Sequence, residues 1–172
     1  MMTKETAKEI VDLLFRMYDE DNNFFVINHH TKGLVLSFIG GEPFMNIETI
    51  RFIADYFINE CFIRNHIWLT NFRFSISTNG LLYFKPEVQN FLQSYDDFIS
   101  MTITLDGPKE LHDMCRVDHD NIGSFDRSFE AWKDWNEKKK PIDTKVTIAP
   151  ENLSKINTIC DFFISHGCKM II

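Results

Sequence analysis

Hydrophobic positions in this 172-residue chain recur at helical spacing in some stretches and at alternate residues in others. Helical spacing predicts helices over residues 3–18, 50–61, 124–139 and 153–163, with a short helix after Pro86. Strand patterns separate them, over residues 34–39, 73–78, 99–105 and 144–149, and residues 169–172 resemble the opening of another strand. Loops are predicted over residues 19–32 and between residues 106 and 124. This alternation is typical of βα units with parallel strands and right-handed connections.

Two helix ends carry local signals. Thr3 is predicted to cap the first helix, and Gly167 stands where a glycine commonly ends a helix. The buried stripe of the first helix is expected to contain Ala7, Ile10, Val11, Leu14, Met17 and Tyr18.

The stretch from Ile99 to Asp106 alternates most clearly, with apolar residues at odd positions and polar residues at even positions. Ser75 and Ser77 repeat the polar face on the preceding strand. Because both faces of an ordinary parallel sheet are buried, a polar face indicates a wet cavity. We therefore predict an α/β fold, a partial open (β/α) barrel with parallel strands and outer helices. It is expected to form a single, incomplete domain over residues 1–172, with about four βα units around a ligand.

Charge, apolar stretches and cysteine spacing argue against several classes of function. The chain has 18 Lys and Arg against 25 Asp and Glu, a net charge of −7, which argues against nucleic acid as a partner. Its apolar stretches fall short of the roughly 20 residues that span a bilayer, and no secretion signal opens it. We expect a cytoplasmic protein with reduced thiols that does not insert into membranes. The cysteines at 61, 115, 160 and 168 form no Cys-x-x-Cys pair, so no metal or cluster site is predicted within this chain.

Candidate chemistry lies where the predicted strands end, because ligands of such folds bind beyond the carboxyl ends of the strands. Turn geometry explains Gly80, Pro108 and Pro150, but it explains less well the carboxylates of Glu42 and Asp106 and the amide of Asn79. In Gly40-Gly41-Glu42-Pro43, the glycines allow a close approach of the backbone to a ligand, and the carboxylate suits an ammonium group. An amine-bearing ligand fits this segment better than a phosphate does.

Four segments, in order, carry a resemblance to one family. Residues 37–43 contain Gly-Gly-Glu-Pro, a motif of radical S-adenosylmethionine enzymes, and residues 77–80 resemble their Thr-Asn-Gly strand end. Residues 104–126 contain Thr-Leu-Asp-Gly-Pro, then His-Asp and Arg, and are similar to the branch of anaerobic sulfatase maturases and peptide maturases. Residues 147–152 look like the fourth strand and turn of peptide maturases. The resemblance covers nearly the whole chain.

This resemblance implies a partial barrel of the radical S-adenosylmethionine type and a set of site residues. Gly40, Gly41 and Glu42 would hold the amino group of the methionine moiety, and Arg116 would bind its carboxylate. Asn79 and Thr104 would contact the ribose or backbone of the ligand. Asp106 would order its turn or face the substrate.

The resemblance also implies a reaction and partners. In this family a reduced [4Fe–4S] cluster donates an electron to S-adenosylmethionine, and the resulting 5′-deoxyadenosyl radical takes hydrogen from a peptide or protein substrate. An electron donor such as flavodoxin or ferredoxin would serve the parent enzyme. The Cys-x-x-x-Cys-x-x-Cys loop that binds the cluster is absent from this sequence. We therefore expect the central part of a longer enzyme, inactive by itself and at best a weak binder of S-adenosylmethionine.

Two other hypotheses remain. A barrel without the cysteine loop could act as a non-catalytic module that binds peptides or serves as a scaffold. Alternatively, Asp106, His112 and His119 could bind the metal of a barrel hydrolase, although a solvated loop explains this stretch more simply.

Overall fold

The computed structural model describes residues 2–20, 33–118, 120–138 and 143–172. Their contacts divide into two compact units. The first unit comprises Met1–Ile76 and Pro86–Ser100, and the second comprises Ser77–Lys85 and Met101–Ile172. Residues 21–32, most of the predicted loop before the first strand, lie outside the described residues.

The strands confirm the predicted α/β fold with parallel pairing and outer helices. β1 (Leu34–Phe38), β2 (Phe72–Thr78) and β3 (Ile99–Ile103) form a sheet in that order. β1 runs parallel to β2, with Ser37 beside Ser75. β4 (Asp143–Thr144) and β5 (Met170–Ile171) form a second parallel pair, so residues 169–172 do open a strand.

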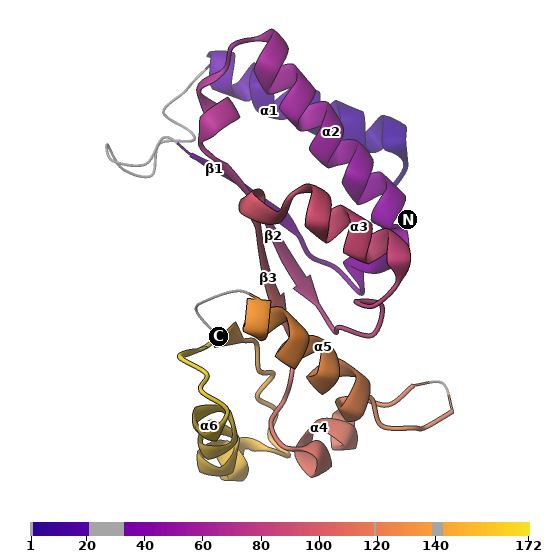
Figure 1. Ribbon diagram of the computed structural model, residues 1–172, viewed down its shortest axis with the longest axis vertical. Coiled ribbons are helices and arrows are strands. Elements are labelled where there is room, and N and C mark those ends of the chain that lie inside the picture. The colour runs from indigo at the N-terminus through magenta and orange to yellow at the C-terminus, as the bar shows by residue number, and fades with distance from the viewer. Residues whose placement is uncertain (1, 21–32, 119, 139–142) are drawn as a thin grey trace. The chain divides into compact units, whose positions relative to one another are not determined.

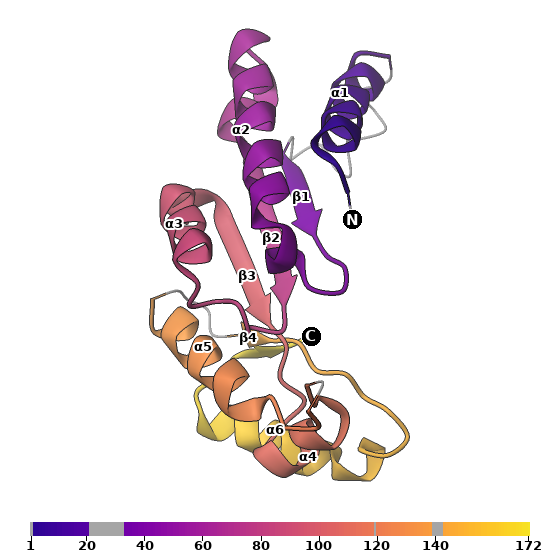
Figure 2. The same cartoon turned by 90° about the vertical axis from the view of Figure 1, so that its right-hand side faces the viewer.

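In the first unit, helices cover one face of the strands, as Figures 1 and 2 show. The α-helices are α1 (Lys4–Glu20), α2 (Ile47–Ile63) and α3 (Pro86–Ser94), and the 3₁₀ helices are η2 (Pro43–Asn46), η3 (Ile67–Thr70) and η4 (Asp96–Phe98). The predicted cap of α1 is present, because the Thr6 N–H donates to Thr3 Oγ1 at 3.2 Å. α1 and α2 pack against each other, with the Phe15 and Phe57 rings stacked at 5.8 Å.

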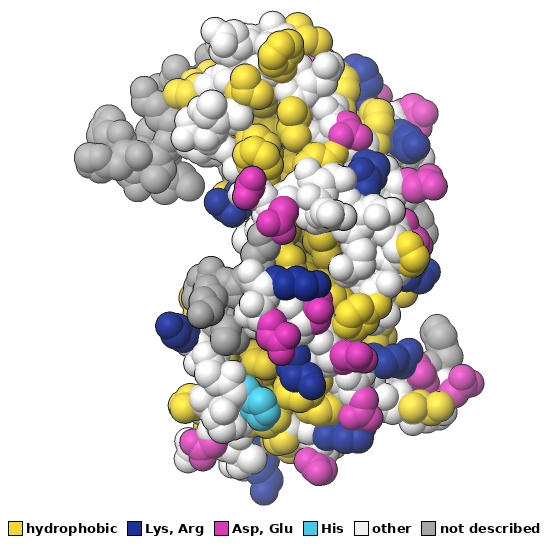
Figure 3. Space-filling view, viewed as in Figure 1, with side chains coloured by type: hydrophobic (Ala, Val, Ile, Leu, Met, Phe, Trp, Pro, Cys, Tyr) yellow, Lys and Arg dark blue, Asp and Glu magenta, His cyan; other side chains and the backbone are white. Residues whose placement is uncertain are grey.

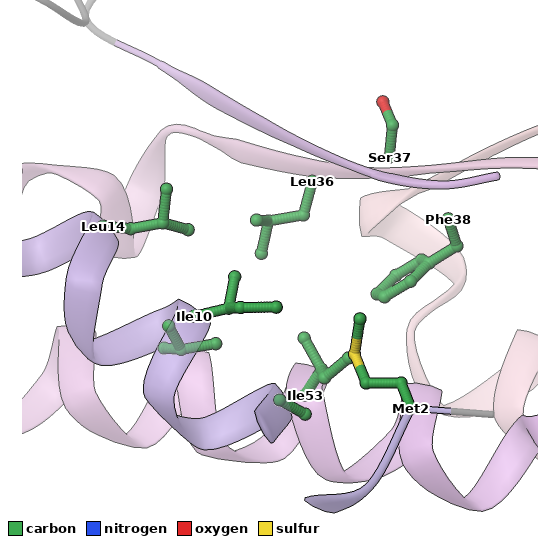
Figure 4. Close-up of a pocket in the computed structure, with 9 residues that line it drawn as sticks. Met2, Ile10, Leu14, Leu36, Ser37, Phe38 and Ile53 are labelled. Carbon is green, nitrogen blue, oxygen red and sulfur yellow. The ribbon is translucent and has the colours of Figure 1, made fainter. Parts of the chain in front are cut away.

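The sheet of the first unit has one buried face and one open face. Phe74 and Ile76 of β2 are buried, whereas Val35 of β1 is 61% exposed. Figure 4 shows Leu36 and Phe38 pointing toward the helices, into an apolar cavity of about 150 Å³, while Ser37 points the other way. Alternate residues therefore do point to a buried and an open face, as the alternating burial along β3 also shows, but the open face carries the apolar Val35 as well as Ser37.

One detail of the α1 prediction is wrong. Phe15 is fully buried, whereas Ile10, which we placed in the buried stripe, is 42% exposed. Ala7, Val11 and Phe15 recur every four residues, so the buried stripe lies on a slightly different line of the helix surface.

The second unit contains three α-helices and the 3₁₀ helix η5 (Leu153–Lys155). The α-helices are α4 (Lys109–Cys115), α5 (Phe125–Lys138) and α6 (Ile156–Ser165). α6 ends as predicted, with Gly167 at φ +75° and the Cys168 N–H donating to the Phe163 carbonyl at 2.9 Å.

Two predictions in this unit need correction. The segment between residues 106 and 124 is not all loop, because α4 occupies seven of its residues. α4 is only seven residues long and its one buried residue is the polar His112, so no buried apolar stripe marks it. The strand predicted over residues 144–149 is shorter, with β4 at Asp143–Thr144. Strand-like bonds continue to the Val146 N–H, which donates to the Ile172 carbonyl at 2.9 Å, and end at Thr147, whose N–H donates to the Asp106 carboxylate at 2.8 Å.

Candidate functional site

The Gly-Gly-Glu segment follows β1 in the first unit. Glu42 caps η2, since its Oε1 accepts a hydrogen bond from the Phe44 N–H at 3.1 Å. A Cβ placed on Gly40 or on Gly41 would meet no atom within 4 Å. Packing in the described chain therefore does not require glycine at either position, although the φ of +159° at Gly40 lies at the edge of the region that favours glycine.

The glycines after β2 and β3 behave differently. Gly80 and Gly107 have φ of +80° and +117°, where residues other than glycine are strained. A Cβ would lie 3.0 Å from Ile103 Cγ2 at Gly80 and 2.9 Å from Ile159 Cγ1 at Gly107. Their own turns and packing account for these two glycines. The open backbone at Gly40 and Gly41 instead suits the close approach of a ligand.

Asn79 and Thr104 lie in the second unit, after β2 and β3. Asn79 Oδ1 accepts from the Leu81 N–H at 2.9 Å, and the Asn79 carbonyl accepts from Ser128 Oγ at 2.7 Å. The Thr104 N–H donates to the Thr78 carbonyl at 2.9 Å, and Thr104 is 8% exposed. These bonds hold both residues firmly at the strand ends.

Asp106 and Arg116 form a nearly buried ion pair. The side chain of Asp106 is 4% exposed and accepts hydrogen bonds from Arg116 Nε and, at 3.4 Å, from Nη2. Nη2 also donates to Thr147 Oγ1 at 3.1 Å, and the Thr147 N–H donates to Asp106 Oδ1. These bonds orient the guanidinium, while 28% of the Arg116 side chain stays exposed.

His112 lies behind this ion pair and is fully buried. Its Nδ1 accepts from the Asp106 N–H at 3.2 Å, and its Nε2 lies 3.0 Å from Ser124 Oγ. Ser124 Oγ in turn donates to the Arg116 carbonyl at 2.9 Å. Desolvation by burial, opposed by the nearby Asp106 carboxylate, lowers the pKa of His112 from its ordinary value.

These contacts bear on the metal-hydrolase hypothesis. Both ring nitrogens of His112 are engaged, and the Asp106 carboxylate is paired with a guanidinium. Among the residues that the structure describes, no group of three His, Cys, Asp or Glu side chains is arranged to hold a metal ion. His119 lies outside the described residues. The described contacts therefore give this hypothesis no support.

The predicted residues thus fall into two groups. Gly40, Gly41 and Glu42 belong to the first unit, and the second unit brings Asp106 and Arg116 into direct contact. Sequence reasoning noticed the His112-Asp113 motif but not the bridging role of His112, and it assigned no role to Ser124 or Thr147. Spacing carried no signal for these contacts, because Thr147 is 41 residues from Asp106.

In the described ranges, none of the helices combines the length and apolar character needed to cross a membrane. On the face shown in Figure 3, basic and acidic side chains are interspersed. The strand ends therefore remain the best candidates for a functional site.

Comparisons with known proteins agree on one group of relatives. The chain is 27% identical over 136 residues to the radical SAM cyclopropyl synthase TigE of Paramaledivibacter caminithermalis, covering 79% of this chain and 25% of that protein. It is 30% identical over 147 residues to a cysteine-type anaerobic sulfatase-maturating enzyme of Clostridium novyi, covering 84% of this chain and 37% of that protein. No model of a known protein family matches the chain.

Solved structures show the same fold. The structure of native anSMEcpe with bound AdoMet and Cp18Cys peptide superimposes with a TM-score of 0.76 and 20% identity, over 99% of this chain and 42% of that one. Native anSMEcpe with bound AdoMet gives a TM-score of 0.75 over 99% of this chain and 41% of that one, also at 20% identity. The chain thus spans less than half the length of each of these proteins.

Proposed function

We propose that this chain, which is related to the radical S-adenosylmethionine maturases by sequence and by fold, is the part of such an enzyme that binds S-adenosylmethionine for the modification of a peptide. One of these relatives is named a sulfatase-maturating enzyme, and one of the similar solved structures contains a bound peptide, which supports a peptide or protein as the substrate class. The proposal concerns this chain, which spans 25% and 37% of the two relatives matched by sequence.

The observation that carries the proposal is the open backbone at Gly40 and Gly41. Space beside both Cα atoms allows an amino acid moiety to lie against the main chain. Glu42 follows directly, and a carboxylate can accept an ammonium hydrogen bond in addition to the Phe44 N–H that it already accepts. In this proposal the Gly-Gly-Glu segment binds the amino group of S-adenosylmethionine.

The other predicted residues are proposed, from their places in the family's motifs, to bind the opposite charge and the nucleoside. Arg116 is proposed to bind the methionine carboxylate through its exposed part, with Asp106 holding the guanidinium in place. Thr104 and Asn79 are proposed to contact the ribose or the ligand backbone. Asp106 would then act as a positioning residue that also borders the substrate.

A reduced [4Fe–4S] cluster, when bound beside S-adenosylmethionine, supplies the electron that yields a radical for hydrogen abstraction. The ligand loop for this cluster does not occur in this sequence, so the cluster is proposed for the whole enzyme, with flavodoxin or ferredoxin as the electron donor. The residues of this chain are proposed to bind and orient S-adenosylmethionine.

Calorimetric titration of S-adenosylmethionine into the 172-residue chain tests the proposal. Glu42→Gln keeps an acceptor for the cap of η2 and removes the charge, so we expect binding to weaken about tenfold. Glu48→Gln, in the first turn of α2, is the matched control and should bind like the unchanged protein. Absence of binding at millimolar ligand, or equal affinities for the two variants, would refute the proposal. Peptide binding in that case would favour the non-catalytic module.

A further inference from the structure

We propose that His112 is a positioning residue that holds Asp106 and Arg116 in the arrangement in which Arg116 recognises a carboxylate. The inference rests on the function proposed above, because the carboxylate in question is that of S-adenosylmethionine. It goes beyond that function by assigning a role to a fully buried histidine that touches no ligand.

The first support is a chain of hydrogen bonds behind the ion pair. It runs from the Asp106 N–H to His112 Nδ1 at 3.2 Å, and from Nε2 to Ser124 Oγ at 3.0 Å. It ends at the Arg116 carbonyl, which accepts from Ser124 Oγ at 2.9 Å. One imidazole therefore links, through a single hydroxyl, the main chains of the two residues whose side chains form the ion pair.

The second support is the partial exposure of Arg116. Its side chain is 28% exposed, whereas that of Asp106 is 4% exposed, so of the two partners only Arg116 is accessible to a ligand. A guanidinium binds a carboxylate best when its plane is fixed before binding. The Asp106 side chain fixes this plane only if the main chains of Asp106 and Arg116 keep their relative positions. The hydrogen bonds of His112 provide the link that holds them there.

The hydrogen-bond partners of His112 determine which of its ring nitrogens carries the hydrogen. The Asp106 N–H can only donate, so Nδ1 must be unprotonated and Nε2 carries the hydrogen that faces Ser124 Oγ. A proton on Nδ1 would place two donors against each other and break the link at Asp106. The aromatic ring of Phe125, from α5, packs on the imidazole at 5.7 Å. The charged groups that act on His112 are Asp106, Lys109, Asp113 and Arg116.

Three substitutions of His112 separate its two hydrogen bonds. His112→Asn keeps an acceptor near the position of Nδ1, His112→Gln keeps a donor near the position of Nε2, and His112→Phe keeps the ring and loses both. Binding is measured by calorimetry with two probes, S-adenosylmethionine and its decarboxylated analogue. The analogue lacks only the group that Arg116 is proposed to bind.

We expect His112→Phe to weaken binding of S-adenosylmethionine about tenfold and to leave binding of the decarboxylated analogue within about twofold. His112→Asn should recover most of the lost affinity, because it restores the acceptor for the Asp106 N–H. Because burial lowers the pKa of folded His112, affinity for S-adenosylmethionine should stay constant around pH 6.5 and fall only at the lower pH where the folded imidazole takes up a proton, and it should stay flatter in His112→Asn. Equal weakening for both probes, or no recovery in His112→Asn, would overturn the inference.

A replacement variant and the binding of the unchanged protein show whether the inference or the proposed function has failed. If His112→Phe does not fold, Ser124→Ala takes its place, since it removes only the hydroxyl and keeps the Ser124 N–H bonded to the Arg116 carbonyl at 3.0 Å. Ser124→Ala should then show the same preference between the probes. If the unchanged protein binds neither probe, the proposed function itself fails and this inference falls with it. If it binds both but no variant distinguishes them, only the inference fails.

Discussion

The Asp106–Arg116 ion pair allows a prediction of stability that can be worked out from its contacts. Asp106→Asn keeps the size of the side chain and an oxygen that can accept from the Thr147 N–H, so the change is confined to the guanidinium. Asp106 accepts two hydrogen bonds from Arg116, and hydrogen bonds to charged groups contribute about 1.5–3 kcal/mol each. Because one of them is 3.4 Å long and Arg116 is 28% exposed, water recovers part of the loss.

We therefore expect Asp106→Asn to lower the free energy of unfolding by about 2–3 kcal/mol, or the melting temperature by roughly 4–12 °C for a chain of this size. Urea unfolding followed by tryptophan fluorescence measures this loss, because Trp132 and Trp135 are buried in the same unit. Asp126→Asn is the matched control, since Asp126 pairs with Lys109 while 75% exposed. It should change stability by less than about 0.5 kcal/mol.

A double-mutant cycle isolates the pair itself. Arg116→Met alone leaves the Asp106 carboxylate buried without its guanidinium, and Asp106→Asn combined with Arg116→Met removes both charges. The double variant should be more stable than the sum of the single losses predicts, by about 1–2 kcal/mol. If the cycle gives no coupling, or if Asp106→Asn is no more damaging than Asp126→Asn, the reasoning about this ion pair is wrong.

Three other predictions follow from particular residues. Gly107→Ala should destabilise the protein by about 1–3 kcal/mol in thermal unfolding, because φ at Gly107 is +117° and a Cβ there would lie 2.9 Å from a side-chain carbon of α6. Gly41→Ala, the control, should change stability little. Equal effects of the two substitutions would contradict this prediction. Burial lowers the pKa of folded His112 below its ordinary value of 6.5, so the unfolded chain binds a proton at a higher pH than the folded chain does. Urea titrations should therefore give a free energy of unfolding that is constant above pH 6.5 and decreases below it. The decrease should be smaller in His112→Asn. Burial raises the pKa of Cys61 to about 12, so its thiol should not react with iodoacetamide at pH 8, whereas the exposed Cys115 should be labelled. Peptide mass mapping measures both. Rapid labelling of Cys61 would show that the core around this residue opens to solvent.

Much of the fold was predictable from spacing alone. The strand before Gly40, the strand that ends at Thr78, and the α2 and α5 helices lie within a few residues of their predicted positions. Their residues alternate or recur within a single element, so the pattern that buries one face is written in neighbouring positions. The glycine that ends α6 is likewise a local feature, since its positive φ is set by the last turn of the helix.

The candidate site was predictable only in part. The sequence placed Gly40, Glu42, Asp106 and Arg116 at strand ends or in a motif, but no spacing rule indicates that an ion pair joins residues 106 and 116. α4 escaped prediction because its one buried side chain is a histidine held by hydrogen bonds rather than by an apolar stripe. The predicted fourth strand stops early because a carboxylate from another segment takes its N–H.

The sequence by itself therefore determined the order of the helices and strands other than α4, their parallel pairing and the strand ends where chemistry is expected. The tertiary structure alone decided which of these residues touch, and it is the source of the link from Asp106 through His112 and Ser124 to Arg116. The physical reason is the distance along the sequence over which each signal acts. Periodicity reports which face of one element is buried, whereas a hydrogen bond between distant residues forms only after the chain has folded them together.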